Sequence, residues 1–390
     1  MKKILYYPAL EKHKCYHYFP LSLLAVASAM KDDVVIIDER VDPPEKLEQH
    51  ILTADAILFT AYTGYQLACM YAKAKWVKEN YPNIKVVLGG PHVTLLKSQC
   101  LESPYIDEVS CGYAEKGENE LPWHLIDVAK YINPETERFI YVSSYSCIGK
   151  CSFCATIPRR KLVFLPLEKV QRDIDNLMEL YPFKQAVLFD ATLFTKPDRA
   201  LFVSQLMKKH SLSWICDSRA DEVCRMDKGV LDKIVNSGLQ QITIGLETGN
   251  ERMANFIKKG KNHVEKFKEC ARILSEYNVI MASGLIFGMP TETIDELKET
   301  VQYVEEIRAI NKNFRLSTTF WKPLPATELT EFIKRNYGYR EPSSLKEWAE
   351  LGAGNHFEYN TWMDNPWIEN QGEYRAIYDK FKLDNQDIFI

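Results

Sequence analysis

The sequence lacks any apolar run long enough to cross a membrane. Its longest such run, residues 21–30 (LSLLAVASAM), has half of the roughly 20 residues that a membrane-spanning helix needs. The N-terminal residues carry two lysines but are interrupted at Pro8 and lead into the charged stretch EKHK, which indicates a first buried strand and not a secretory signal. We therefore expect a protein without a membrane span that stays in the cytoplasm.

An excess of positive charge is missing as well. The 49 Lys and Arg residues are outnumbered by 53 Asp and Glu residues, which gives a net charge of −4 and a pI near 6.1. Such a chain has no basic field to attract DNA or RNA, so we expect no nucleic-acid partner. Its 46% hydrophobic and 26% charged residues are typical of globular proteins, and 390 residues suffice for two or three domains.

A second pair of closely spaced cysteines, common in zinc sites, is also absent. Three of the ten cysteines, Cys147, Cys151 and Cys154, instead share one short CxxxCxxC segment. In a chain without an export signal, this spacing favours metal binding in a reducing compartment over disulfide bonds. Three thiolates on one loop can hold a 4Fe-4S cluster and leave one iron without a protein ligand. A zinc site and buried structural cysteines are the alternatives.

Alternating strand and helix patterns predict an α/β fold with two parallel sheets. Residues 1–125 are expected to form a Rossmann-like sheet, and residues 126–138, which end in the polar stretch 133–138 (NPETER), a linker. Over residues 139–325 six strand and helix units follow one another, which indicates a partial (β/α)6 barrel. Residues 326–390 lose the alternation and are expected to form a small, mostly helical C-terminal cap. That cap is rich in aromatic residues: Trp348, Phe357, Tyr359, Trp362, Trp367, Tyr374 and Tyr378.

The CxxxCxxC segment after the first barrel strand resembles the radical S-adenosylmethionine (radical SAM) superfamily. Further matches end later strands, at residues 189–191 (FDA), 218–221 (SRAD), 245–249 (GLETG) and 284–290 (GLIFGMP). The resemblance implies that Cys147, Cys151 and Cys154 hold the 4Fe-4S cluster. It also implies that S-adenosylmethionine contacts Phe153 at its adenine, Asp190 at its amino group, Arg219 at its carboxylate, Glu247 at its ribose, and Ser283. The FDA segment departs from the glycine-rich acidic form usual in the family, and Arg219 and Glu247 could instead form a structural ion pair.

The first domain is similar to the cobalamin-binding domain that is fused to many radical SAM enzymes. The similarity lies in residues 18–24 (YFPLSLL), 60–64 (TAYTG), 88–92 (LGGPH) and 112–118 (GYAEKGE). It implies that cobalamin contacts Thr60, Thr63, Gly64, Gly89, Gly90, Gly112 and Tyr113. The DxHxxG motif that supplies a histidine to cobalt is absent, so cobalamin would bind without that ligand. His92 is read as a structural residue, and a domain that has lost cobalamin binding is the alternative.

Together the two resemblances imply a class B-type radical SAM methyltransferase. It would methylate an unactivated carbon of a small molecule through a 5′-deoxyadenosyl radical and methylcobalamin, with the substrate beneath the aromatic cap and a flavodoxin or ferredoxin as electron donor. Core packing is the alternative for those aromatics. The second candidate is a cobalamin-dependent enzyme that cyclises, rearranges or oxidises its substrate. A methylthiotransferase is less favoured because no shared spacing links the remaining N-terminal cysteines: Cys15, Cys69, Cys100 and Cys111. A non-catalytic electron carrier would leave the barrel without a purpose.

Overall fold

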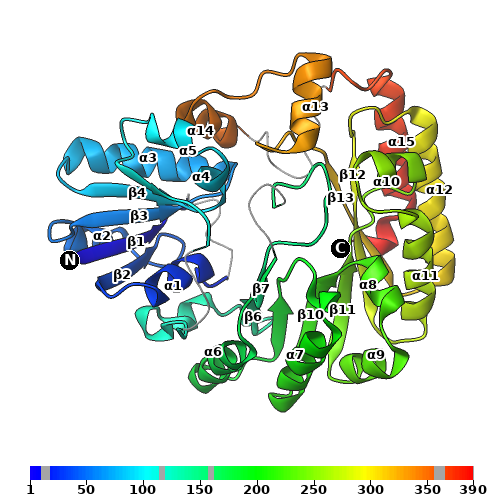
Figure 1. The fold of residues 1–390 in the computed structure, drawn as a ribbon, viewed down its shortest axis with the longest axis horizontal. Helices are drawn as coiled ribbons and strands as arrows, with labels where there is room; N and C mark the ends of the chain where they lie inside the picture. Colours follow the sequence, from blue (N-terminus) through cyan, green and yellow to red (C-terminus); the bar gives the residue numbers. More distant parts are fainter. Residues whose placement is uncertain (10–17, 114–118, 157–161, 355–364, 390) are drawn as a thin grey trace.

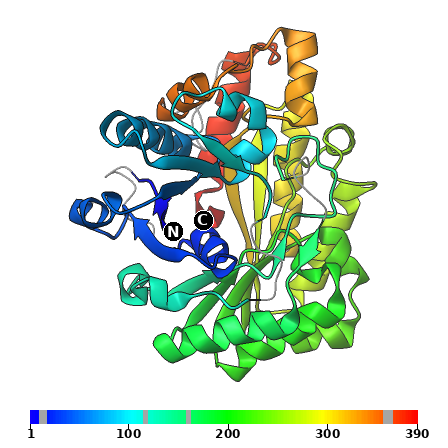
Figure 2. The same cartoon turned by 60° about the vertical axis from the view of Figure 1, so that its left-hand side comes forward.

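Two parallel sheets lie side by side in this computed structural model, which describes residues 1–9, 18–113, 119–156, 162–354 and 365–389 (Figures 1 and 2). The N-terminal part of the chain forms the first sheet, the middle part forms the second, and the C-terminal helices extend over both. Within the described residues, no helix is both long enough and apolar enough to cross a bilayer. The predicted α/β architecture with its helical C-terminus is confirmed.

The first sheet has the strand order β2-β1-β3-β4-β5, and all of its neighbours are parallel. Its strands are β1 (Lys2–Tyr7), β2 (Asp33–Asp38), β3 (Ala56–Thr60), β4 (Lys85–Gly89) and β5 (Glu108–Ser110). Its helices are α1 (Leu21–Ser28), α2 (Pro44–Ile51), α3 (Tyr65–Asn80), α4 (Pro91–Leu95) and α5 (Lys97–Leu101). The chain changes direction across the sheet between β1 and β3. Ligands of open α/β sheets bind at such a switch point, beyond the carboxyl ends of the strands.

The second sheet is an open barrel with six parallel strands in the order β13-β12-β11-β10-β9-β6. Its strands are β6 (Arg138–Tyr141), β9 (Gln185–Leu188), β10 (Ser213–Ser218), β11 (Leu239–Ile244), β12 (Ile280–Phe287) and β13 (Phe314–Phe320). The helices outside it are α6 (Leu167–Leu180), α7 (Pro197–Lys209), α8 (Ala220–Arg225), α9 (Lys228–Val235), α10 (Glu251–Phe256), α11 (His263–Ser275) and α12 (Ile294–Ile310). A small antiparallel pair, β7 (Ser144–Tyr145) and β8 (Val163–Phe164), flanks the thiol loop.

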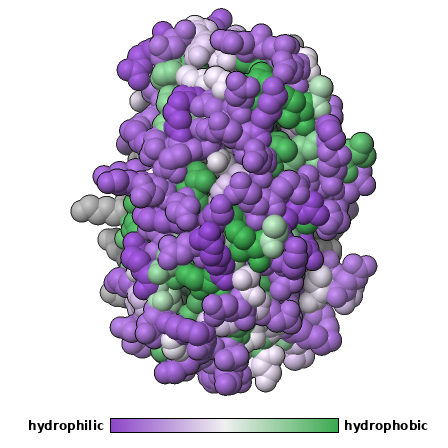
Figure 3. Space-filling model, turned by 90° about the vertical axis from the view of Figure 1, so that its right-hand side faces the viewer, coloured by the Kyte–Doolittle hydropathy of each residue, from purple (hydrophilic) through white to green (hydrophobic). Residues whose placement is uncertain are grey.

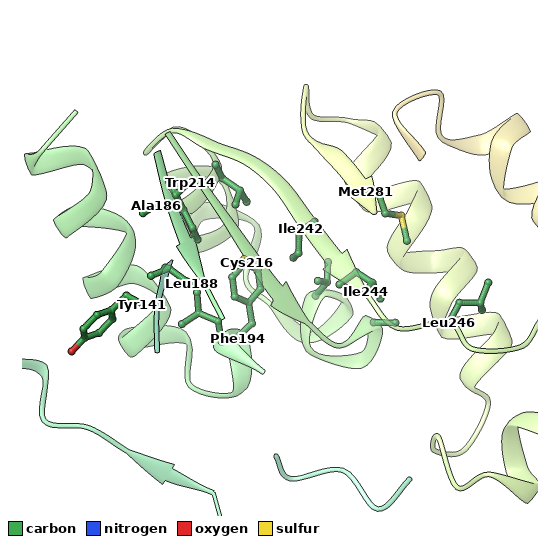
Figure 4. Packing of buried hydrophobic residues seen from close by; sticks show 14 of the residues in the cluster. Tyr141, Ala186, Leu188, Phe194, Trp214, Cys216, Ile242, Ile244, Leu246 and Met281 are labelled. Carbon is green, nitrogen blue, oxygen red and sulfur yellow. The ribbon is translucent and has the colours of Figure 1, made fainter. Parts of the chain in front are cut away.

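Alternate strand residues form the core between the barrel sheet and its helices. Trp214 and Cys216 of β10 and Ile242 and Ile244 of β11 are almost fully buried there (Figure 4). Successive strand residues point to opposite faces of the sheet. The half-buried Asp217 and every second residue before it in β10 therefore face the barrel interior. On the opposite, outer side the helices expose a mainly hydrophilic surface with small apolar areas (Figure 3).

The segment predicted as a linker packs against the first sheet. Val128 and Tyr131, in a short 3-10 helix (Val128–Tyr131), are buried, and the Tyr131 hydroxyl donates to Asp38 Oδ2 at 3.1 Å. The ring of Phe19, just before α1, packs edge-on against the ring of Trp123, with the ring centroids 5.2 Å apart. These contacts make the junction a packed one. The domain boundaries at 125, 138 and 325 stay predictions.

The C-terminal helices pack against both sheets. α13 (Glu328–Tyr337) and α14 (Leu345–Ala353) are followed by α15 (Gln371–Asp384), and the three lie against different parts of the molecule (Figure 1). Trp348 of α14 belongs to the core of the first sheet, whereas Tyr374 and Tyr378 of α15 belong to the core of the barrel, with Trp367. For these four aromatics the core-packing alternative holds, while Phe357, Tyr359 and Trp362 lie outside the described residues.

Candidate functional site

The loop with the three cysteines begins directly after β7. The Gly149 amide donates to Cys147 Sγ at 3.2 Å. A Cβ placed on Gly149 would lie 3.4 Å from Cys147 Sγ and 3.7 Å from Cys151 Sγ, so these two sulfurs converge on one side of the loop. The Ser152 amide donates to Ile257 O at 3.0 Å and ties the loop to the end of α10. The sequence thus places Cys147, Cys151 and Cys154 together on one braced turn.

Three thiolates on one short loop are the donor set of a 4Fe-4S cluster with one iron left open, so the residues present fit such a cluster. A zinc ion needs all of its sulfur ligands about 2.3 Å from one centre, whereas a cluster binds each thiolate to a different iron and therefore needs wider spacing. Burial raises the pKa of the Cys151 thiol, and the positive charges of Lys259 and Arg219 partly offset this and favour the thiolate.

Arg219 and Glu247 both lie near the thiol loop but do not pair with one another. Arg219 Nε donates to Asp221 Oδ1 at 2.9 Å, and its Nη1 is 3.0 Å from the Cβ position of Gly149. Glu247 Oε1 accepts from Lys259 Nζ at 3.2 Å, with only 15% and 10% of the two side chains exposed. The geometry therefore replaces the single ion pair considered from the sequence by two separate ones.

Lys259 and Asp217 are polar groups of this site that sequence reasoning missed. Lys259 follows α10 in the run Lys-Lys-Gly-Lys, which is the only signal that could have marked it. Asp217, at the end of β10, accepts from the Thr243 hydroxyl, and burial raises its pKa to about 6. It precedes the SRAD segment by one residue, so its position at a strand end was the available signal.

The Asp190 side chain is directed at other protein groups and not at open space. Its carboxylate is fully buried and accepts from the Ser143 amide at 3.1 Å, from Ser143 Oγ at 2.9 Å and from Ser144 Oγ. Burial raises its pKa, and the serine hydrogen bonds act in the opposite direction. Asp190 thus braces the segment that leads into the thiol loop. Its neighbour Phe189 is 62% exposed.

Ser283 and the ring of Phe153 also face protein. Ser283 is 1% exposed and its hydroxyl donates to Ile244 O at 2.7 Å. It shares its strand face with Met281 and Leu285, which pack against the helices. The Phe153 ring is partly buried against the hydrophobic core, and its contact with adenine stays a prediction.

A cavity of about 470 Å³ opens at the switch point of the first sheet. Leu5, Leu58 and Val87 supply apolar walls, and the strand ends supply small and polar groups. Among the predicted cobalamin contacts, the lining includes Thr60, Gly89, Gly90, Gly112 and Tyr113.

Gly90 gives this cavity its shape. Its φ is +97°, and a Cβ would lie 2.8 Å from the backbone N and O of Ala61 and from Thr60 Oγ1. Only glycine adopts this conformation readily. An apolar cavity with a glycine and hydroxyl edge suits a large ring ligand with a polar tail, so the residues present fit cobalamin.

Two predicted cobalamin contacts, Thr63 and Gly64, are not part of the cavity lining. Thr63 Oγ1 is 2.9 Å from His92 Nδ1. Gly64 lies so close to α14 that a Cβ on Gly352 would be 2.3 Å from the Gly64 carbonyl oxygen. His92 is fully buried, with its pKa lowered by burial to about 4, and packs edge-on against Trp348 at 5.7 Å. This geometry agrees with the structural interpretation of His92.

Tyr145 joins the two parts of the site. It comes from β7, two residues before Cys147, yet it lines the cavity of the first sheet. Its ring stacks on that of Tyr113, with centroids 4.5 Å apart and an angle of 20° between the planes. The thiol loop and the glycine-edged cavity therefore lie next to each other across the junction of the two sheets.

Known proteins resemble the chain in both parts. The family described as the radical SAM superfamily matches residues 141–304, and the B12 binding domain family matches residues 15–121. An uncharacterized methyltransferase of Pyrococcus horikoshii is 23% identical over 375 residues, which cover 81% of this chain and 79% of that protein. A cytidylyl-2-hydroxyethylphosphonate methyltransferase of Streptomyces wedmorensis is 23% identical over 68% of this chain, and the match spans about half (53%) of that relative.

Among solved structures, the fold is similar to that of the radical S-adenosylmethionine methyltransferase TsrM from Kitasatospora setae, determined with cobalamin and a 4Fe-4S cluster bound. The TM-score is 0.73 at 11% sequence identity, and the match covers 100% of this chain and 92% of TsrM. At this identity the similarity concerns the fold alone.

Proposed function

We propose that this chain, which belongs to the radical SAM superfamily and carries an N-terminal B12-binding domain, methylates an unactivated carbon of a small molecule. Its cofactors are accordingly a 4Fe-4S cluster, S-adenosylmethionine and cobalamin. When bound, they supply a 5′-deoxyadenosyl radical, which removes a substrate hydrogen, and a transferable methyl group. The protein has to hold the substrate carbon between the two sources.

One observation carries the proposal: Tyr145 lines the cavity of the first sheet and lies two residues before the first thiol of the loop. A substrate radical has to meet its methyl donor before it reacts with anything else, so the two cofactor sites must adjoin. The Tyr113 and Tyr145 stack bridges them. An arrangement with the sites on opposite sides of the molecule would not support methyl transfer.

In the barrel, we assign cluster binding to Cys147, Cys151 and Cys154. Arg219, next to the loop, is assigned to the carboxylate of S-adenosylmethionine, and the backbone of Phe153 to its adenine. Glu247, oriented by Lys259, is assigned to the ribose hydroxyls. Asp190 and Ser283 are positioning residues in this proposal, because their polar atoms are already hydrogen-bonded to Ser143 and Ile244.

In the first sheet, we assign direct cobalamin contacts to the residues that line the cavity. These are Thr60, Gly89, Gly90, Gly112 and Tyr113. Thr63 and Gly64 act indirectly, since they hold His92 and α14 in place behind the cavity. The cobalt receives no ligand from His92, whose ring is buried against Trp348. We also propose a cytoplasmic location, because thiolate ligands persist in a reducing compartment.

Anaerobic reconstitution with iron, sulfide, cobalamin and methyl-labelled S-adenosylmethionine tests this function. With a strong reductant, the protein should release both 5′-deoxyadenosine and S-adenosylhomocysteine, and candidate small molecules should gain the labelled methyl group. Release of 5′-deoxyadenosine with no S-adenosylhomocysteine would contradict methylation and favour cyclisation, rearrangement or oxidation. Failure to bind four irons would contradict the whole assignment.

A further inference from the structure

A second cavity, of about 440 Å³, opens beside the thiol loop and is lined mainly by positive charge. The loop itself contributes Ile148, Gly149 and Lys150 to its lining. The segment after α10 contributes Lys258 to Lys261, and Arg219 lines it as well. The whole chain carries a net charge of −4, so this concentration of positive charge is a local departure from the rest of the molecule.

The charges of this cavity form an inner and an outer group. Arg219 and Lys259 lie deeper and are paired with Asp221 and Glu247. Lys150, Lys258 and Lys261 are exposed at the edge, and we call these three the lysine rim. The acidic group that pairs with this rim is Glu328, an exposed partner of Lys258. Ile148, within the loop, is 47% exposed and adds an apolar contact next to the rim.

We propose that the lysine rim and Ile148 form the docking surface for an acidic one-electron carrier protein. The proposal rests on the proposed function, which requires one electron for each cleavage of S-adenosylmethionine. The carrier loses one electron and the cluster gains it. Transfer of this electron to the sulfonium then breaks its carbon–sulfur bond. No proton or further reactant is needed for the docking step.

The geometry favours a protein over a small anion. A small anion would bind the inner groups, which are already paired with carboxylates, whereas the rim charges project from two separate segments and match a broad surface. An apolar contact surrounded by charge is the usual composition of a transient protein interface. The Gly149 backbone, between two of the thiols, forms the wall of this surface, so a docked carrier would lie close to the cluster.

The double variant Lys258→Glu/Lys261→Glu of the reconstituted full-length protein tests the proposal and leaves the thiol loop unchanged. Stopped-flow absorbance would follow cluster reduction by a reduced acidic flavodoxin and, separately, by dithionite. Electrostatic steering changes association rates by about 10-fold to 10³-fold. We expect flavodoxin to reduce the variant at least about tenfold more slowly at low salt, while dithionite reduces both proteins equally.

Lys346→Glu is the matched control, since this exposed lysine lies on α14 against the other sheet. It should leave both rates unchanged, and Lys258→Arg/Lys261→Arg should keep the flavodoxin rate. A second measurement needs no variant: the flavodoxin rate of the unmodified protein should fall steeply with ionic strength. An equal flavodoxin rate in the double variant, or a salt-independent rate in the unmodified protein, would overturn the proposal. Absence of 5′-deoxyadenosine with dithionite would instead refute the proposed function.

Discussion

The two sheets share one plan but form their ligand surfaces by different means. Both are parallel and lie side by side (Figures 1 and 2), and Tyr113, after β5, stacks on Tyr145 of β7 at their junction. In the first sheet the edge of the surface is formed by backbone, since Gly89 and Gly90 line the cavity and Gly90 packs so closely on the Ala61 backbone that a Cβ would not fit. In the barrel it is made by charged and sulfur-bearing side chains.

This difference predicts opposite sensitivities to mutation. A surface formed by backbone should tolerate changes of charge and fail when a Cβ is added. A surface formed by functional groups should fail when a group is removed, although the fold persists. Each substitution below is designed to affect one of the two sites and leave the other intact.

Removal of one sulfur should give the largest effect. Cys151→Ala deletes one of three cluster ligands, so production of 5′-deoxyadenosine should fall to background in a liquid chromatography assay. Cobalamin binding, followed by corrin absorbance, should be retained because the cavity belongs to the first sheet. Cys224→Ala is the control, since this cysteine of α8 lies outside the thiol loop and donates to Lys266 O at 3.4 Å. Residual activity of Cys151→Ala close to that of the unmodified protein would remove the basis of the barrel site.

Addition of one methyl group should abolish much of the cobalamin binding. Gly90→Ala places a Cβ 2.8 Å from the Ala61 backbone, which a well-packed site accommodates at a cost of about 1–3 kcal/mol. Relief of this clash should displace the Gly90 edge of the cavity, so affinity for cobalamin, measured by absorbance titration, should fall by about 5-fold to 150-fold. Cleavage of S-adenosylmethionine at the cluster should continue.

Gly338→Ala is the control for a glycine with positive φ away from the cavity. Gly338 is left-handed (φ +65°, ψ 23°), and a Cβ there would meet nothing within 4 Å, so its substitution costs roughly 1–2 kcal/mol. Gly90, at φ +97° and ψ −173°, has a conformation that is essentially restricted to glycine, so Gly90→Ala combines greater backbone strain with crowding. Equal cobalamin affinity in the two variants would show that Gly90 does not shape the ligand surface.

The same contrast explains what the sequence could predict. The cluster cysteines lie within eight consecutive positions, so their proximity follows from the chain itself. The strand pattern likewise predicted both parallel sheets, because buried strands and amphipathic helices leave distinct periodicities. Both features depend only on the order of residues within short stretches of the chain.

Features set by contacts between distant segments were predicted poorly. Asp190 and Ser283 follow from family motifs, but their burial depends on the face of the strand and on partners such as Ser143. The aromatic composition of the C-terminal segment indicated burial without saying against which sheet. Trp348 Nε1 donates to Gln99 Oε1 at 3.0 Å, across 249 positions of sequence, and no local pattern encodes that pairing.

A charge pair of the barrel should give a smaller and specific effect. Lys259→Met leaves Glu247 largely buried without its partner, so affinity for S-adenosylmethionine should fall by about tenfold, or roughly 1.4 kcal/mol. Glu247→Gln should act on the same step, and the double variant should lose less than the sum of the two because the residues interact directly. Calorimetric titration of the reconstituted protein would measure the three affinities.

Lys258→Met serves as its neighbouring control. Lys258 pairs with Glu328, but both side chains are more than half exposed, at 51% and 64%, and such pairs contribute little. Affinity for S-adenosylmethionine should therefore stay unchanged. Additive losses at Lys259 and Glu247 would show that the pair does not act as a unit.

The last effect concerns stability in place of ligand affinity, and its dependence on pH should distinguish how the C-terminal helices are attached. α14 is attached to the first sheet by a neutral bond between Trp348 and Gln99, but α15 is attached to the barrel through the buried carboxyl of Glu292. Tyr374 donates to Glu292 and accepts from the Gly288 amide at 2.7 Å. Burial raises the pKa of Glu292 to about 7, above its ordinary value of 4.5.

Between those two pH values the native state holds a proton that the unfolded chain has released, so the free energy of unfolding should fall as pH rises from about 5 to 7 and then level off. Each pKa unit corresponds to about 1.4 kcal/mol. Glu292→Gln should reduce this slope, since the amide keeps a hydrogen-bonding group without a titrating proton, while Asp217 and Asp190, whose pKa values burial also raises, should account for the slope that remains. Thermal unfolding across this range would show the slope, and hydrogen exchange should place the loosening in α15 and not in α14. If Glu292→Gln keeps the slope, or if α14 loosens equally, another group controls it, and the two attachments do not differ in the way that their chemistry indicates.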